Sequence, residues 1–216
     1  MNAEEKDCIK NDEKDMETSD PEPLTLPRDQ YWDVYLAHVG GSTNYVLIRF
    51  VGEEYSDQLH IFENALEEEF RKGKTTQITV GMVYVAYTDD LYHRVKVLSV
   101  DDEKITCFFL DHGDVDILNT EDLRPLDKAI NRKLPYQIIN ASLHGLGNVS
   151  QNETALTVLS QMALGRSCVA EPIVRYDEES IELVLYDTNG GVDININEEI
   201  IQQVRNTIRK SRSRGA

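Results

Sequence analysis

The chain has 216 residues, 40% of them hydrophobic, and a formal net charge of −17. The hydrophobic share is enough for one or two packed domains. The negative charge disfavours wrapping a nucleic-acid backbone, because phosphate contacts need lysine or arginine, and it favours basic partners. An acidic surface also simply keeps a protein soluble. The three cysteines contain no Cys-x-x-Cys pair, so neither a disulfide framework nor a zinc clip is indicated.

Residues 1–28 are rich in Glu, Asp, Lys and Ser and lack apolar periodicity, which predicts a disordered acidic arm. Two β-rich runs, 31–39 and 44–51, are parted by Gly40-Gly41 and predict a hairpin. Apolar residues then recur at steps of three and four, which predicts an amphipathic helix ending before Gly73: Tyr55, Leu59, Phe62, Leu66 and Phe70.

The middle of the chain predicts a tight antiparallel meander. Two alternating runs, 83–87 and 92–97, are joined by a turn at 88–90. A third run, 105–110, leads into Asp111-His112-Gly113-Asp114, where the glycine permits a sharp turn before a fourth short strand at 115–118. Rings fall at the strand ends and turns, where they can crowd around one exposed pocket suited to a delocalised cation: Tyr87, Tyr92, His93, Phe109 and His112.

Strand alternation decides which rings point inward. On the third strand only one phenylalanine needs to be central, and we predict Phe108 in the core and Phe109 in the pocket. A one-residue slip of the hairpin would exchange the faces of Tyr92 and His93. Tyr92 therefore competes with His93 for the pocket.

The last third of the chain predicts a second set of strands and helices. A connector at 123–134 leads to a strand at 136–143, and beyond Gly147 comes a helix capped by Ser150. The expected elements that follow are β-rich runs at 169–175 and 181–186, a short strand at 192–196, a helix at 198–208 and a basic tail at 209–216.

The run Phe109-Leu110-Asp111-His112-Gly113-Asp114 resembles the aromatic-x-Asp-aromatic-Gly-Asn run that ends the third strand of Tudor domains. Residues 30–208 resemble the extended Tudor module of germline proteins of the Tejas-like and Tapas-like kind. The resemblance implies a mainly β fold with helices, in which an SH3-like Tudor barrel is inserted into a staphylococcal-nuclease-like (SN-like) oligonucleotide-fold domain. After the 1–28 arm, the implied divisions are 29–78 for the first part of the SN-like domain and a linker helix, 79–126 for the barrel, and 127–208 for the second part, before the 209–216 tail.

Carried over position by position, the resemblance places the family's methylarginine cage on Tyr87, His93, Phe109 and His112, with Asp114 in place of the guanidinium-bonding amide. It implies a non-catalytic scaffold that binds arginine-rich segments, including symmetrically dimethylated Arg-Gly segments, of partners such as Piwi-type proteins in the piRNA pathway. The implied location is the cytoplasm, in perinuclear germ granules (nuage). Two histidines and an aspartate depart from the pattern and predict weak methyl selectivity.

Two other binding functions stay open: an RNA-binding oligonucleotide fold, which the acidic balance disfavours, and a scaffold that contacts partners without reading methylation. We expect no enzyme, because no recognisable motif pairs a nucleophile with a base or places two carboxylates in a cleft. We expect no membrane span either, since no segment approaches the roughly 20 apolar residues that a span requires. With no secretory segment, the protein is expected in the cytosol or nucleus.

Imidazoles and carboxylates near one another could also hold a metal ion. His93, His112, Asp111 and Asp114 show no helix-borne His-x-x-x-His and no facial-triad spacing. Asp111 has a simpler expected role, accepting hydrogen bonds from turn amides at the strand end. The sequence therefore predicts no metal site and no cofactor.

Overall fold

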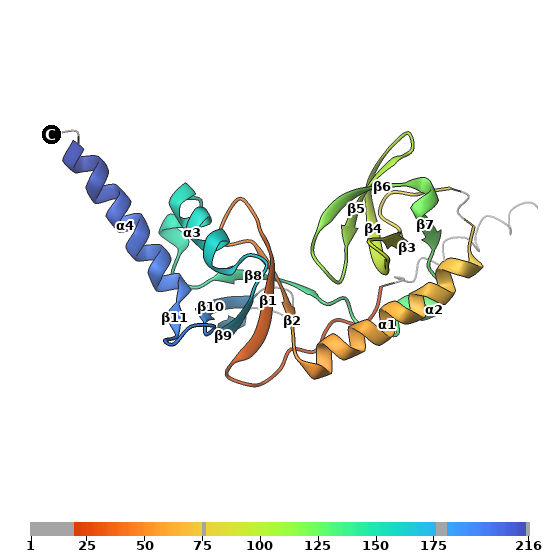
Figure 1. The fold of residues 1–216 in the computed structure, drawn as a ribbon, viewed down its shortest axis with the longest axis horizontal. Coiled ribbons are helices and arrows are strands. Elements are labelled where there is room, and N and C mark those ends of the chain that lie inside the picture. Colours follow the sequence, from red (N-terminus) through yellow and green to blue (C-terminus); the bar gives the residue numbers. More distant parts are fainter. Residues whose placement is uncertain (1–19, 75–76, 176–180, 215–216) are drawn as a thin grey trace, which may run out of the picture.

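The computed structural model describes residues 20–74, 77–175 and 181–214. Figure 1 shows two β-rich lobes beside a long helix, α1 (Glu53–Lys72). The strands of the first lobe come from both ends of the chain, and those of the second lobe come from the middle. The fold is mostly β with helices, and the second lobe is inserted into the first, as the order of predicted elements indicated.

The first lobe is a six-stranded sheet in the order β11-β10-β8-β2-β1-β9. Because β9 also pairs with β10, the sheet closes on itself. Buried residues alternate along its strands, so one face of each strand points into a common core. The strands are β1 (Trp32–Val39), β2 (Val46–Phe50), β8 (Ile138–Leu143), β9 (Ser167–Arg175), β10 (Ile181–Asp187) and β11 (Ile194–Asn195).

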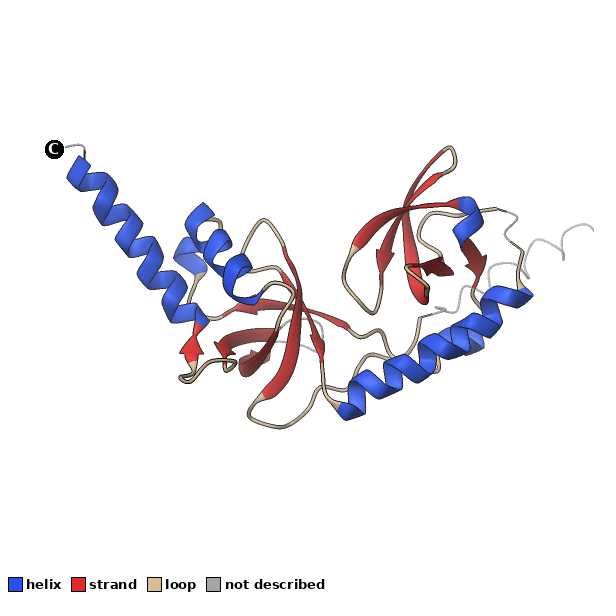
Figure 2. Cartoon of the chain, viewed as in Figure 1, coloured by secondary structure: helices blue, strands red, loops and turns tan. Residues whose placement is uncertain are grey.

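Two helices pack on the first lobe, α3 (Glu153–Ala163) and α4 (Ile196–Arg214), after a short 3-10 turn, η2 (Gly147–Val149). The α3 cap is Asn152, whose side chain accepts hydrogen bonds from the first-turn amides, and not the predicted Ser150. The start of α4 supplies the buried core residues Ile196, Ile200 and Val204, and beyond them the helix extends away from the lobe (Figure 2). Its basic end is therefore helical up to position 214, six residues past the predicted helix end at 208.

The second lobe is an antiparallel sheet in the order β6-β5-β4-β3-β7. Its elements are β3 (Val83–Thr88), β4 (Leu91–Asp101), β5 (Lys104–Phe109), β6 (Val115–Asn119), the 3-10 turn η1 (Thr120–Asp122) and β7 (Leu123–Pro125), followed by the short helix α2 (Lys128–Asn131). The predicted meander is confirmed. Its first turn has two central residues, Asp89 and Asp90, with φ of 52° and 62°. Positive φ at both positions is typical of a type I′ hairpin turn, which fixes the register of β3 and β4.

Helix α1 has the predicted amphipathic pattern and packs on the second lobe. Leu59, Phe62 and Leu66 are buried in a cluster with Val85 of β3 and Leu134 of the connector. Acidic residues in its first turn and basic residues in its last turn complement the helix dipole. Its buried apolar residues face the barrel, beside which the helix lies in Figure 1.

A buried ion pair joins the barrel to the connector. Arg94 of β4 donates to both carboxylate oxygens of Asp111, at 2.9 and 2.6 Å, and to the backbone carbonyls of Asn131 and Leu134. The guanidinium carbon lies 4.3 Å from the ring centre of Phe62 on α1. The expectation that Asp111 serves turn amides is wrong: it pairs with Arg94 and accepts from the backbone amide of residue 137.

Gly113 brings the turn after β5 against the first lobe. Its φ is 85°, and a Cβ there would lie 3.1 Å from Ile138 Cδ1 and 3.2 Å from Ala37 Cβ. Glycine is needed both for the positive φ and for this close approach. The turn that carries His112 is thus in contact with both lobes.

Residues 20–28 differ from the predicted disordered arm, because Leu24 and Leu26 pack on the first lobe and Asp20 accepts a hydrogen bond from Tyr136. The remainder of that arm, 1–19, lies outside the described residues. Among the helices of the described segments, none combines the length and apolar character required to traverse a lipid bilayer.

Candidate functional site

A cavity of about 430 Å³ opens at one end of the second lobe. Its walls come from the β3–β4 turn, from β4 and from the segment around the β5–β6 turn. The lining residues are Thr88, Asp89, Leu91, His93, Phe109, His112, Asp114, Val115 and Asp116. A larger cavity of about 600 Å³, near Lys74 and Arg124, is lined by polar and charged side chains and offers no ring to stack on a ligand. The ring-lined cavity is therefore the better candidate.

Three rings form the inner wall of this cavity. His93 lies edge-on to Phe109, with ring centres 5.4 Å apart, and edge-on to His112, with centres 4.9 Å apart. Phe109 is 6% exposed and belongs to the barrel core as well as to the cavity lining. The prediction that Phe108 is the core residue is wrong: it is half-buried, because β5 alternation places Phe109 inside. Phe109 therefore both fills the barrel core and lines the cavity.

The structure does not bring Tyr87 and Tyr92 into the cavity lining. They are direct partners across the β3–β4 ladder, whereas His93 pairs with Ala86. Since cross-strand partners share a face and neighbours along a strand alternate, both tyrosines lie on the face opposite His93. Their rings, 4.9 Å apart, pack on Phe70 of α1.

Thr88 and Leu91 take the places on the cavity face that the tyrosines leave. They are the last pair before the two-residue turn, and they share the face of Ala86 and His93. Sequence reasoning missed them because it treated residues 88–90 as the turn. The signal that could have found them is Asp89-Asp90, since a two-residue turn forces residue 88 to face residue 91.

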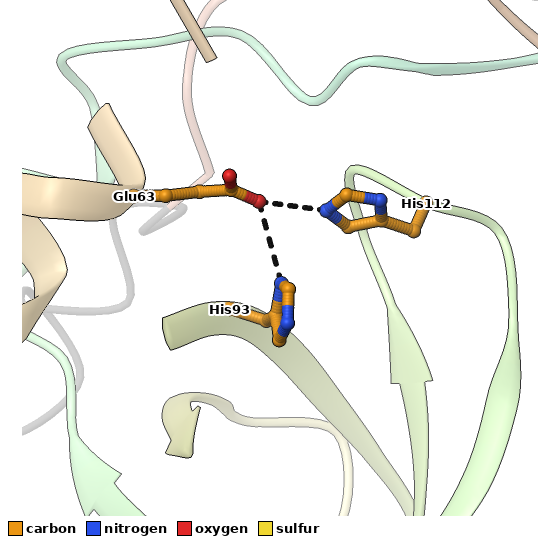
Figure 3. A group of neighbouring side chains, drawn as sticks. All are labelled: Glu63, His93 and His112. Atoms are coloured by element: carbon orange, nitrogen blue, oxygen red, sulfur yellow. Dashed lines mark hydrogen bonds and ion pairs between the residues drawn. The ribbon is translucent and has the colours of Figure 1, made fainter. Parts of the chain in front are cut away.

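Glu63 reaches the cavity's inner wall from α1 and was not predicted. Figure 3 shows its carboxylate beside both imidazoles. Oε1 lies 2.7 Å from His112 Nε2, a hydrogen-bond distance, and 3.3 Å from His93 Nδ1. The sequence signal was a charged residue within the apolar stripe of α1, one turn after Leu59.

Carboxylates lie both at the inner wall of the cavity and at its mouth. Burial alone would raise the pKa of the Glu63 carboxyl, but its contacts with His112 and His93 outweigh burial and lower the pKa to about 2. At the mouth, Asp89, Asp114 and Asp116 are exposed carboxylates that line the same cavity. Rings inside and carboxylates around the mouth are suited to a delocalised cation.

Comparison with known proteins identifies the family of this chain and the solved structures that share its fold. The Tudor domain family model matches residues 26–145. Tudor domain-containing protein 7A of Danio rerio is 31% identical over 186 residues, which cover 83% of this chain and 17% of that relative. The chain therefore spans about a sixth of the length of this curated relative.

Two solved structures share the fold across most of this chain. The human TDRD1 extended Tudor domain, in complex with a symmetrically dimethylated peptide, has a TM-score of 0.69 at 18% identity and covers 84% of this chain and 92% of its own. The Drosophila melanogaster Papi extended Tudor domain, in complex with a Piwi N-terminal peptide, has a TM-score of 0.64 at 16% identity. That match covers 81% of this chain and 97% of the Papi domain. The chain belongs to the Tudor domain family, with the fold of an extended Tudor domain.

Proposed function

We propose that this chain is a non-catalytic module that binds an arginine side chain of a partner protein in the cavity at the end of the second lobe. The observation that carries the proposal is the ring-lined, acid-rimmed cavity at the turn where the Tudor-like run 109–114 ends. Extended Tudor domains of the same fold have been solved with symmetrically dimethylated and Piwi N-terminal peptides. A Piwi-type partner of the piRNA pathway, held in cytoplasmic germ granules, is the proposed context.

The cavity offers rings to contact the guanidinium face and a carboxylate to accept its N–H groups. Phe109 and His112 present ring surfaces to the cavity, and cation–π contact with a ring favours a delocalised cation. The exposed carboxylate of Asp114 can accept the guanidinium N–H groups in a charge-assisted hydrogen bond. Ionised Glu63 adds negative charge at the inner wall.

The same residues predict weak selectivity for methylation. Thr88 and Leu91 stand where an aromatic wall would enclose methyl groups, so the ring surface is limited to Phe109 and two imidazoles. A carboxylate acceptor serves unmodified arginine at least as well as methylated arginine, because methylation removes N–H donors. We therefore propose that the module accepts both forms.

The test is a titration of the full chain with Arg-Gly peptides, unmodified and symmetrically dimethylated, and with single-stranded RNA in parallel. We expect both peptides to bind within tenfold of each other, or about 1.4 kcal/mol. Asp114→Ala should weaken both, whereas Asp57→Ala, which removes an exposed carboxylate from α1 outside the cavity lining, should weaken neither. RNA binding with no peptide binding, or equal losses in both variants, would overturn the proposal.

A further inference from the structure

Three side chains from separate parts of the fold converge beside the cavity. One ligand-type atom each from Glu63, His93 and His112 lies within 4.8 Å of the others, the only such cluster of three or more in the described ranges 20–74, 77–175 and 181–214. Glu63 comes from α1, His93 from β4 and His112 from the turn after β5. The sequence concealed this cluster, since Glu63 and His112 are 49 positions apart.

The donor set has a defined chemistry. Two imidazole nitrogens and one carboxylate oxygen are ligands that zinc and neighbouring transition metals favour. Zinc bonds to such atoms are about 2.0 to 2.2 Å long, and tetrahedral geometry then puts the ligand atoms about 3.3 Å apart. Oε1 of Glu63 is 3.3 Å from His93 Nδ1 and 2.7 Å from His112 Nε2. The third pair, the His93 and His112 nitrogens, lies within 4.8 Å, so the side chains would have to shift to tetrahedral spacing to admit an ion.

A second observation points independently to a ligand at this place. The His93 side chain is nine-tenths buried, and its Nδ1 has no hydrogen-bond partner even though it points toward Glu63. Figure 3 shows this nitrogen in ion-pair contact with Glu63, 3.3 Å away. A buried polar atom without a hydrogen bond is destabilising, and a metal ion bonded to the nitrogen would remove that cost.

We propose that Glu63, His93 and His112 bind one divalent transition-metal ion of the zinc class. Three protein ligands leave a fourth position, and the adjoining cavity gives that position access to water or to an incoming group. His112 is the entry side of the site, because its side chain is 26% exposed while that of His93 is 9% exposed. The ion would also tie α1 to the barrel, since the ligands come from both.

The test uses the full chain stripped with a chelator and titrated with Zn²⁺ alone, followed by calorimetry, with Co²⁺ as a spectroscopic substitute and Mg²⁺ as a hard-cation control. We expect one Zn²⁺ per chain, visible absorption bands of four- or five-coordinate Co²⁺, and no comparable Mg²⁺ binding. Because no peptide is present, this measurement is made separately from the arginine test. A bound ion would use Glu63 and His112, which the arginine-binding proposal also uses, so the two ligands are expected to compete for the site.

Variants locate the ion. Glu63→Gln and His112→Tyr should each lower Zn²⁺ affinity by at least about tenfold, since even loss of a residue that only supports a ligand costs that much. His144→Gln is the matched control, because His144 also pairs with a carboxylate, Glu182, but has no second imidazole there. Absence of Zn²⁺ binding, or a loss in His144→Gln equal to that in the two site variants, would overturn the proposal and leave a hydrogen-bonded cluster only.

Discussion

Arg94 and Asp111 form a two-point ion pair inside the protein, with side-chain exposures of 0% and 3%. We predict that Asp111→Asn lowers the free energy of unfolding by about 3 to 5 kcal/mol, because it leaves a buried guanidinium without its counter-charge. Urea unfolding of the variant and of wild type measures this. Asp57→Asn, at an exposed site, is the control and should change stability by less than about 0.5 kcal/mol. A small loss in Asp111→Asn would mean that Arg94 finds enough acceptors in the connector carbonyls.

Two substitutions of Phe109 distinguish its contribution to core packing from its contribution to ligand binding. Phe109→Ala should destabilise the fold by about 3 to 5 kcal/mol, since the ring is buried in the barrel core. Phe109→Leu keeps most of the volume and removes the ring, so it should retain the fold and lose about 0.5 to 2 kcal/mol of peptide affinity. Thermal unfolding and peptide titration of both variants provide the check. Unchanged affinity in Phe109→Leu would show that the ring does not meet the ligand.

Leu91 is the position at which methyl selectivity can be added. It is 48% exposed and lines the cavity, so Leu91→Tyr should place a neutral aromatic ring on the cavity face. The expected gain for dimethylarginine over arginine is about 0.5 to 1 kcal/mol. Tyr87→Leu, which changes the opposite face of the same hairpin, should leave the ratio of the two affinities unaltered. The reverse outcome would place Tyr87 in the binding site.

Tyr136 supplies a pH dependence of stability. Burial raises its pKa to about 12, helped by its hydrogen bond to Asp20 and opposed by one from Asn131. The unfolded value is about 10, so the folded state favours the protonated phenol. Its stabilisation is therefore fully present below pH ~10 and is lost as pH rises toward 12. The stability difference between wild type and Tyr136→Phe should narrow from pH 9 to pH 11 in denaturant titrations. Tyr45→Phe, at an exposed tyrosine, provides the comparison, and a constant difference would contradict the assignment.

The sequence predicted the parts of the fold that depend on local periodicity. The stripe of α1 and the meander followed from the spacing of apolar residues and turns, whereas the insertion of one β unit into another was implied by the family resemblance. Strand faces were harder to predict: the choice between Phe108 and Phe109 depended on which face of β5 points inward, and the placement of Tyr87 depended on whether the β3–β4 turn has two residues or three. That single count reverses which side chains point inward.

The contribution of Glu63 could not be read from the meander at all. It depends on the angle at which α1 crosses the barrel, and that angle is set by packing among residues distant in sequence, such as Leu59, Val85 and Leu134. Local patterns carry no information about such a crossing. The charged residue on an apolar stripe was the one available hint.

The close approach of Gly113 to Ala37 and Ile138 limits how small a working version of this protein can be. An isolated barrel, cut at residues 79–126, would lose the surface against which the His112 turn rests. It would also lose Glu63 and the connector carbonyls that accept from Arg94. The cavity therefore depends on both lobes, and shortening the chain to the barrel would remove the supports of the cavity before any cavity residue had been altered.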